Sequence, residues 1–179
     1  GVTSLEGLDG LPFALNPGTT SGRVIELFFD AIGIKPKYKM MGIAASVDAM
    51  KSGVVDGWFK AGFKDAAILD LESTMDINII PITEESIVKM NKKYPRHGLS
   101  MPVPAGLFNA LTQEQLSFAY VVGDFVHKDV PEDVVYKIVK AVYEKRNEIV
   151  SSLSTLKQGR FTDMYQMAID FGVGRTSQP

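Results

Sequence analysis

The sequence predicts a mixed α/β protein with a mainly parallel sheet, on three observations. Short apolar runs at residues 11–15, 37–41, 54–59 and 77–82 have the length of buried strands. Segments with an apolar face at residues 21–32, 46–53 and 64–71 lie between these runs and are predicted to be helices. With 45% hydrophobic and 22% charged residues, the composition is that of a soluble globular protein. Strands that alternate with helices in this way form βαβ units.

The helices of the first half each have a predicted start and stop. Ser21 is the expected N-cap of the first helix. Gly33 is placed to end that helix, because glycine readily adopts the left-handed conformation found after a helix. Ser46 is the expected cap of the second helix, and Gly53 its stop.

The second half has a different pattern and divides the chain. Thr83 is predicted to cap a helix over residues 84–93, and the proline- and glycine-rich residues 94–108 are predicted to be a linker. A strand is expected within residues 118–125. Asp129 is expected to cap a helix that runs to about residue 150, and a last helix is expected over residues 162–170. The predicted domains are an α/β ligand-binding lobe, 1–82, and a linker with a mostly helical segment of a second lobe, 83–179.

The composition excludes several functional classes. A net charge of −2 leaves no footprint for nucleic acid, and the absence of cysteine rules out disulfide scaffolds and thiolate metal sites. His97 and His127 lie far apart, so we expect no metal, no cofactor and no catalytic residue. No apolar run reaches the ~20 residues of a membrane span. The chain opens at Gly1 without methionine and closes without a helix, so both ends are expected to be cuts through a longer polypeptide.

The turn at residues 16–22 is the most informative stretch for function. It joins a predicted strand to a helix, and free N–H groups at a helix start bind anions. The turn has no glutamate, histidine or cysteine, so it is predicted to hold a ligand without reacting. The expected donors are the N–H groups of Thr19 and Thr20 and the hydroxyls of Thr19, Thr20 and Ser21, with Asn16 and Gly18 completing the site. The alternative is a connector chosen only for its flexibility.

A second group of candidate residues follows the third predicted strand. Trp58 lies at the carboxyl end of that strand, where ligands gather in open α/β sheets. Ala61 and Gly62 are small enough for a ligand to approach the backbone. We therefore expect Trp58, Phe59, Ala61 and Gly62 to line a cleft. The alternative for Trp58 is an ordinary core aromatic residue, and Lys60 is more simply a surface lysine.

Six short motifs follow one another along the chain. They are Ser-Leu-Glu-Gly-Leu-Asp-Gly at 4–10, Gly-Thr-Thr-Ser at 18–21, Asp-Ala-Met-Lys-Ser-Gly at 48–53, Asp-Gly-Trp-Phe at 56–59, Val-Pro-Ala-Gly-Leu-Phe at 103–108 and Val-Pro-Glu-Asp-Val-Val-Tyr at 130–136. The ordered set resembles the TAXI family of TRAP-transporter solute receptors. Thr20 departs from a glycine of that pattern, and Phe63-Lys64 departs from its Gly-x-Pro turn.

The resemblance implies a type II periplasmic binding protein fold and a periplasmic or extracytoplasmic location. One complete lobe would be present, together with C-terminal helices of the other lobe. Most of that other lobe would be missing. The ligand would be a small organic anion, glutamate-like or another carboxylate, the partners would be TRAP membrane subunits, and no enzymatic activity is implied. Apolar surface left by the missing lobe predicts self-association. The alternatives are an enzyme or a regulator effector domain of the same bilobal fold that binds a small anion.

Overall fold

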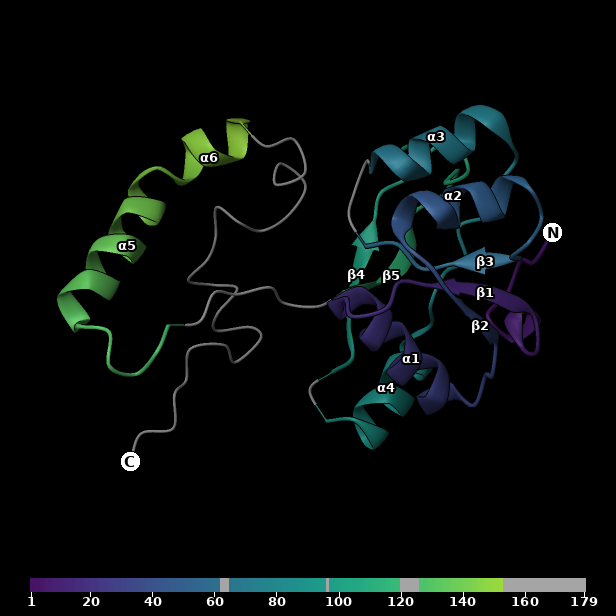
Figure 1. Cartoon of the computed structure of the whole chain (residues 1–179), viewed down its shortest axis with the longest axis horizontal. Coiled ribbons are helices and arrows are strands. Elements are labelled where there is room, and N and C mark those ends of the chain that lie inside the picture. The colour runs from purple at the N-terminus through teal and green to yellow at the C-terminus, as the bar shows by residue number, and fades with distance from the viewer. Residues whose placement is uncertain (62–64, 96, 120–125, 153–179) are drawn as a thin grey trace. The chain divides into compact units, whose positions relative to one another are not determined.

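The computed structural model describes residues 1–61, 65–95, 97–119 and 126–152 (Figure 1). The chain forms two compact units, Gly1–Tyr120 and Val121–Pro179. The first unit holds every strand of the described residues, and the second unit holds helices α5 and α6.

The centre of the first unit is a parallel sheet of three strands. They are β1 (Pro12–Leu15), β2 (Lys37–Met40) and β3 (Gly57–Trp58), in the order β2-β1-β3. Pro12 is in register with Lys37, and Ala14 with Trp58. The prediction of a mixed α/β fold with a parallel sheet is therefore confirmed.

Two of the four predicted strands differ from the prediction. The strand expected over 54–59 is reduced to β3, because the N–H groups of Val54 and Val55 donate to Ala49 O at the end of a helix. The strand expected over 77–82 does not form. The N–H of Ile82 donates to Leu116 O, but residues 77–82 belong to no strand ladder.

Helices cover both faces of the parallel sheet (Figure 1). Helices α1 (Thr20–Ile32) and α4 (Glu84–Lys93) lie on one side, and α2 (Ile43–Lys51) and α3 (Ala66–Thr74) lie on the other. Side chains alternate between the faces along β1, as a strand requires. Phe13 and Leu15 pack into the large cluster with α1, whereas Ala14 packs with Ala49 of α2. Lys51 of α2 and Asp70 of α3 pair at 2.8 Å.

The predicted helix stops hold better than the predicted starts. Gly33 follows α1 with φ of 83°, so its predicted role is confirmed. The cap of α1 is Thr19, whose hydroxyl accepts from the N–H of Gly22, so the prediction of Ser21 was wrong. Helix α2 begins one turn earlier than predicted, after Gly42. Ser46 therefore lies inside the helix and is fully buried.

Helix α4 and an antiparallel strand pair complete the first unit. Thr83 caps α4 through a reciprocal capping box with Ser86, as predicted for the cap. The predicted linker at 94–108 was wrong, because β4 (Leu99–Val103) lies within it and pairs with β5 (Gln115–Ala119). In a sheet of two strands both strands are edges, which is where proline is tolerated, and Pro102 lies on β4.

The boundary of the first unit falls at residue 120, later than the lobe boundary predicted at residue 82. The ring of Phe118 on β5 packs edge-on against Phe28 of α1, with centroids 5.6 Å apart. Asp30 at the end of α1 pairs with Lys93 at 2.7 Å and accepts from the Tyr94 hydroxyl. These hydrogen bonds, from Lys93 first and then Tyr94, hold the pKa of Asp30 below its usual value.

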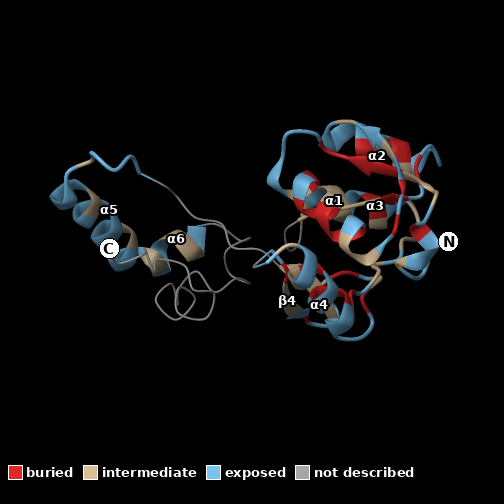
Figure 2. Ribbon diagram, turned by 90° about the horizontal axis from the view of Figure 1, so that it is seen from below, coloured by how far each residue is buried: buried red, intermediate tan, exposed pale blue. Residues whose placement is uncertain are grey.

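The second unit contains α5 (Glu132–Glu144) and α6 (Arg146–Ser152). One helix was predicted here, but the structure has two, because the first helix ends at Lys145. Pro131 occupies the cap position of α5 in place of the predicted Asp129. Neither helix contains a buried residue (Figure 2). The apolar side chains of Val134, Ile138 and Val139 on α5 are exposed. The helix predicted over 162–170 lies outside the described residues.

Candidate functional site

A pocket of about 370 Å³ opens at the N-terminal end of α1. This volume is within the range of small-molecule sites. The pocket lies beside the carboxyl ends of β1 and β2, where open parallel sheets bind ligands. Its lining residues come from β1, the following turn, α1 and β2: Leu15, Asn16, Pro17, Gly18, Thr19, Gly22, Arg23, Glu26 and Met40.

The turn between β1 and α1 is closed by its own hydrogen bonds. The Thr19 hydroxyl donates to Asn16 O at 2.8 Å and accepts from the N–H of Gly22 at 3.0 Å. Gly18 has φ of 70°, which glycine adopts without strain. At Gly22 the backbone passes so close that a Cβ atom would lie 2.3 Å from Asn16 O. The tight turn therefore requires glycine at position 22.

The start of α1 retains donors for a ligand. Within the described residues, the N–H groups of Thr19, Thr20 and Ser21 have no hydrogen-bond partner. The N–H of Gly22 is used by the cap, and the Thr19 hydroxyl makes three hydrogen bonds within the turn, one of them with the Ser21 hydroxyl at 3.2 Å. Adjacent unpaired N–H groups at the positive end of a helix favour an anion. Of the predicted donors, the backbone groups are thus available, whereas the Thr19 hydroxyl is engaged.

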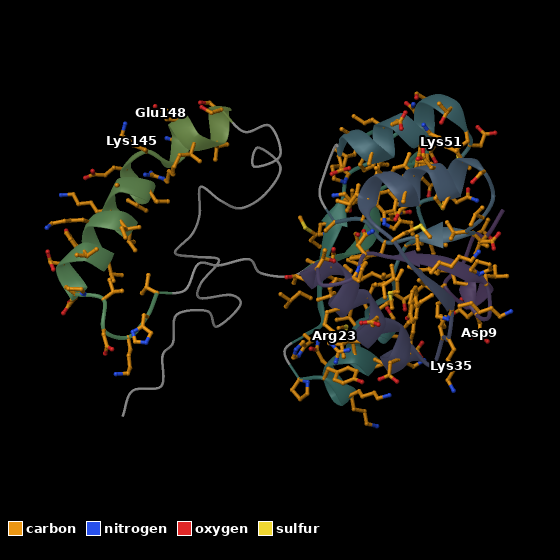
Figure 3. All side chains as sticks on the ribbon, in the orientation of Figure 1. Asp9, Arg23, Lys35, Lys51, Lys145 and Glu148 are labelled. Atoms are coloured by element: carbon orange, nitrogen blue, oxygen red, sulfur yellow. The ribbon has the colours of Figure 1, made fainter. Side chains whose placement is uncertain are left out.

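Two opposite charges border the pocket. Arg23 lies one turn into α1 with an exposed side chain (Figure 3), and its guanidinium is 3.7 Å from the Glu26 carboxylate. At this distance the pair is loose, and the guanidinium keeps donors for a second partner. Sequence reasoning missed both residues. Their spacing of three from Thr20 and from each other on the predicted helix was the signal that could have found them.

Tyr38 on β2 remains a neutral phenol near these charges. Burial first, and then the nearby carboxylates of Glu26 and Asp30, together raise the pKa of Tyr38 to about 12. Tyr38 therefore supplies no negative charge to repel an anion over the physiological pH range.

Asn16 borders the pocket, but its side-chain amide is used within the protein. Its Nδ2 donates to Met41 O at 2.7 Å and to Ser46 Oγ at 3.1 Å. Its Oδ1 accepts from Trp58 Nε1 at 3.0 Å. The side chain is therefore held between the end of β2, α2 and β3.

The second group of predicted residues lies apart from the pocket lining. Trp58 packs in the cluster of Ala14 and Ala49, and its indole N–H donates to Asn16. Phe59 packs against the large core cluster and meets Phe118 edge-on at 6.4 Å. The carbonyl of Ala61 accepts from Lys60 Nζ. Gly62 lies outside the described residues.

The structure thus brings three of the predicted residues into one pocket, namely Asn16, Gly18 and Thr19. Thr20 and Ser21 begin the helix next to it, while Trp58, Phe59 and Ala61 do not line it. Lys60, which was expected to be a surface lysine, pairs with Asp65 at 2.7 Å, and its side chain is 19% exposed.

Replacing Thr19, the N-cap of α1, should lower the stability of the protein. We expect Thr19→Ala to lower the free energy of unfolding by about 1 kcal/mol, because it removes the hydrogen bond to Gly22 N. Thr20→Ala is the matched control, since within the described residues the Thr20 hydroxyl makes no hydrogen bond. Urea denaturation of both variants measures the difference. Equal midpoints would contradict the role of Thr19 as the cap.

The described residues contain no group of three histidine or acidic side chains arranged to hold a metal ion. None of the described helices is both long and apolar enough to cross a membrane.

Comparison with known proteins gives one family. The family model described as "NMT1-like family" matches residues 1–169 of the 179. No curated protein matches the chain. The matched range covers the parallel sheet, the turn and the pocket. The chain therefore belongs to the NMT1-like family, a periplasmic substrate-binding family of the type II periplasmic binding protein kind.

Proposed function

We propose that this chain is an extracytoplasmic solute-binding protein that captures a small organic anion, such as glutamate or another carboxylate, for a TRAP-type transporter. The observation that carries the proposal is the pocket at the start of α1, bordered by unpaired N–H groups, in a member of a solute-binding family. In this proposal the first unit is the ligand-binding lobe, and α5 and α6 belong with the second lobe. The TRAP assignment rests on the ordered motifs that resemble the TAXI receptors.

The pocket has parts for both ends of an organic anion. The N–H groups of Thr20 and Ser21 and the guanidinium of Arg23 can donate to a carboxylate in charge-assisted hydrogen bonds. Leu15 and Met40 offer apolar surface to a carbon skeleton. An inorganic anion would use the first set of contacts and leave the second unused, so the lining favours an organic ligand.

The pocket lining offers little for catalysis. Its titratable side chains are Arg23 and Glu26, which pair with each other. Its one hydroxyl, on Thr19, donates to Asn16 O and is committed to the turn. A hydrolytic or transfer reaction needs a nucleophile with an adjacent base. These residues therefore support capture over an enzymatic role.

Charge variants at the pocket test the sign of the ligand. We expect Arg23→Gln to weaken binding of L-glutamate or succinate about fivefold, the effect of roughly 1 kcal/mol at an exposed site. Glu26→Gln should strengthen binding by a similar factor, because it removes a like charge. Isothermal titration calorimetry with L-glutamate, succinate and sulfate measures each affinity. Lys92→Gln on α4 is the control, since it changes the net charge by the same amount as Arg23→Gln away from the pocket.

The pattern across the variants decides the ligand class. A zwitterion held at both charges would bind more weakly to both variants, and a neutral ligand would be indifferent to both. Equal effects of Arg23→Gln and Lys92→Gln would remove Arg23 from the site and contradict anion capture at this pocket.

A further inference from the structure

A chain of buried and part-buried hydrogen bonds links β3, Asn16 at the pocket, and α2. Trp58 Nε1 donates to Asn16 Oδ1 at 3.0 Å, and Asn16 Nδ2 donates to Ser46 Oγ at 3.1 Å. Ser46 Oγ donates in turn to the carbonyl oxygen of Gly42, the N-cap of α2, at 3.0 Å. We call these three side chains, Trp58, Asn16 and Ser46, the relay.

Two of the three relay side chains, Ser46 and Asn16, are buried. Ser46 is fully enclosed, and Asn16 is 6% exposed. An amide at such a position has no water to replace a lost partner, so each broken hydrogen bond leaves an unpaired group. Both amide hydrogens of Asn16 and its oxygen are engaged, which leaves the side chain one orientation.

The same residue also begins the turn of the pocket. Asn16 O accepts from the Thr19 hydroxyl, which in turn caps α1 at Gly22. The side chain of Asn16 is therefore tied to α2 and β3, and its carbonyl is tied to the start of α1. A shift of the Asn16 side chain would therefore also move its backbone carbonyl oxygen, which accepts the hydrogen bond from Thr19.

We infer that Ser46 and Asn16 are positioning residues: the relay fixes the turn at residues 16–22 against α2 and β3 and couples the pocket to Trp58. The coupling to the pocket rests on the proposed function, whereas the relay of hydrogen bonds does not. Ser46 touches no pocket residue except Asn16 in this chain of bonds, and it acts through that residue. Trp58 then reports on the turn without forming a wall of the pocket.

Trp58 allows a direct test because it is the sole tryptophan of the chain. The indole N–H gives one NMR resonance, whose position and solvent exchange depend on the bond to Asn16. We expect Ser46→Ala to shift this resonance and to accelerate its hydrogen exchange, since the amide loses one of its anchors. Binding of L-glutamate, succinate or sulfate to this variant should weaken about fivefold, the effect of one lost hydrogen bond.

Ser86→Ala is the matched control. Ser86 is also a buried serine in the first turn of a helix of the same unit, but among the described residues its side chain bonds with Thr83 alone, and it lies outside the pocket lining. It should lower the melting temperature without moving the indole resonance or the affinity. If Ser46→Ala does not fold, Trp58→Phe tests the other end of the relay, because it removes the donor to Asn16 and should weaken binding of the same probes.

The outcomes separate the relay from the proposed function. An indole resonance that is equal in Ser46→Ala and Ser86→Ala would overturn the relay, whatever the affinity. A shifted indole with unchanged affinity would overturn the coupling to the pocket. If none of the three probes binds the wild-type protein, anion capture loses its support, and the indole measurement still decides the relay.

Discussion

Gly22→Ala is expected to lower the free energy of unfolding by about 3 kcal/mol and to abolish a well-formed pocket. An added Cβ would lie 2.3 Å from Asn16 O and 3.1 Å from Thr19 Oγ1. The first obstacle is backbone, so the turn itself must move, at the upper end of the ~1–3 kcal/mol for an extra methyl group in a packed site. The lost cap adds about 1 kcal/mol, and the better helix propensity of alanine returns about the same amount.

Gly42→Ala provides the comparison for this variant. Gly42 also stands at a helix start in the first unit, has φ of −74°, and a Cβ there would meet no atom within 4 Å. Its cost should stay below about 1 kcal/mol, the difference between glycine and alanine at a cap. Urea denaturation gives both values, and calorimetry with L-glutamate gives the loss of binding. Similar urea midpoints for the two variants would contradict the close approach of the backbone at Gly22 to Asn16 O.

The parts of the fold that the sequence predicts are those with local signals. The first βαβ unit follows from a short apolar run, an amphipathic helix and a glycine stop, and Gly33 adopts the left-handed conformation that this pattern needs. Thr83 is likewise a local signal, because the cap and its partner are three residues apart. For such elements the interactions that decide the structure lie within one or two turns of the chain.

The errors arise where a distant partner decides. Residues 77–82 are apolar enough for a strand, but apolar character does not specify which neighbour will complete a ladder, and only Ile82 donates to β5. Pro102 suggests a linker, yet a two-stranded pair has room for proline. Ser46 reads as a cap from its neighbours, whereas a hydrogen bond from Asn16, thirty residues earlier, accompanies its buried position.

The candidate site shows the same division. The turn and its free N–H groups follow from residues 16–22 alone. Met40 reaches the pocket because β2 lies parallel to β1, and this requires the sheet order as well as the sequence. The indole of Trp58 is turned to Asn16, a side-chain pair 42 residues apart that no periodicity could indicate.

The packing of β5 on α1 gives the other large effect. Phe28 is 1% exposed, lies in the main core and meets Phe118 edge-on. Phe28→Ala should therefore cost about 3–5 kcal/mol, through lost burial and the cavity that remains. A cost of this size shows that the residue is buried, but it does not show which element buries it.

A double-mutant cycle identifies the covering element. With the milder changes Phe28→Leu and Phe118→Leu, the coupling should be about 0.5–1.5 kcal/mol, as for other edge-on aromatic pairs. Phe28→Leu combined with Val55→Ala is the control, because Val55 packs in the separate cluster with Ala14 and Ala49, and the two effects should add. Additive effects for Phe28 and Phe118 would separate β5 from α1 and return the boundary of the first unit toward residue 82. Coupling would instead show that α1, the helix that borders the pocket, is supported by β5, and mutations in β5 would then be expected to change the affinity of the pocket as well.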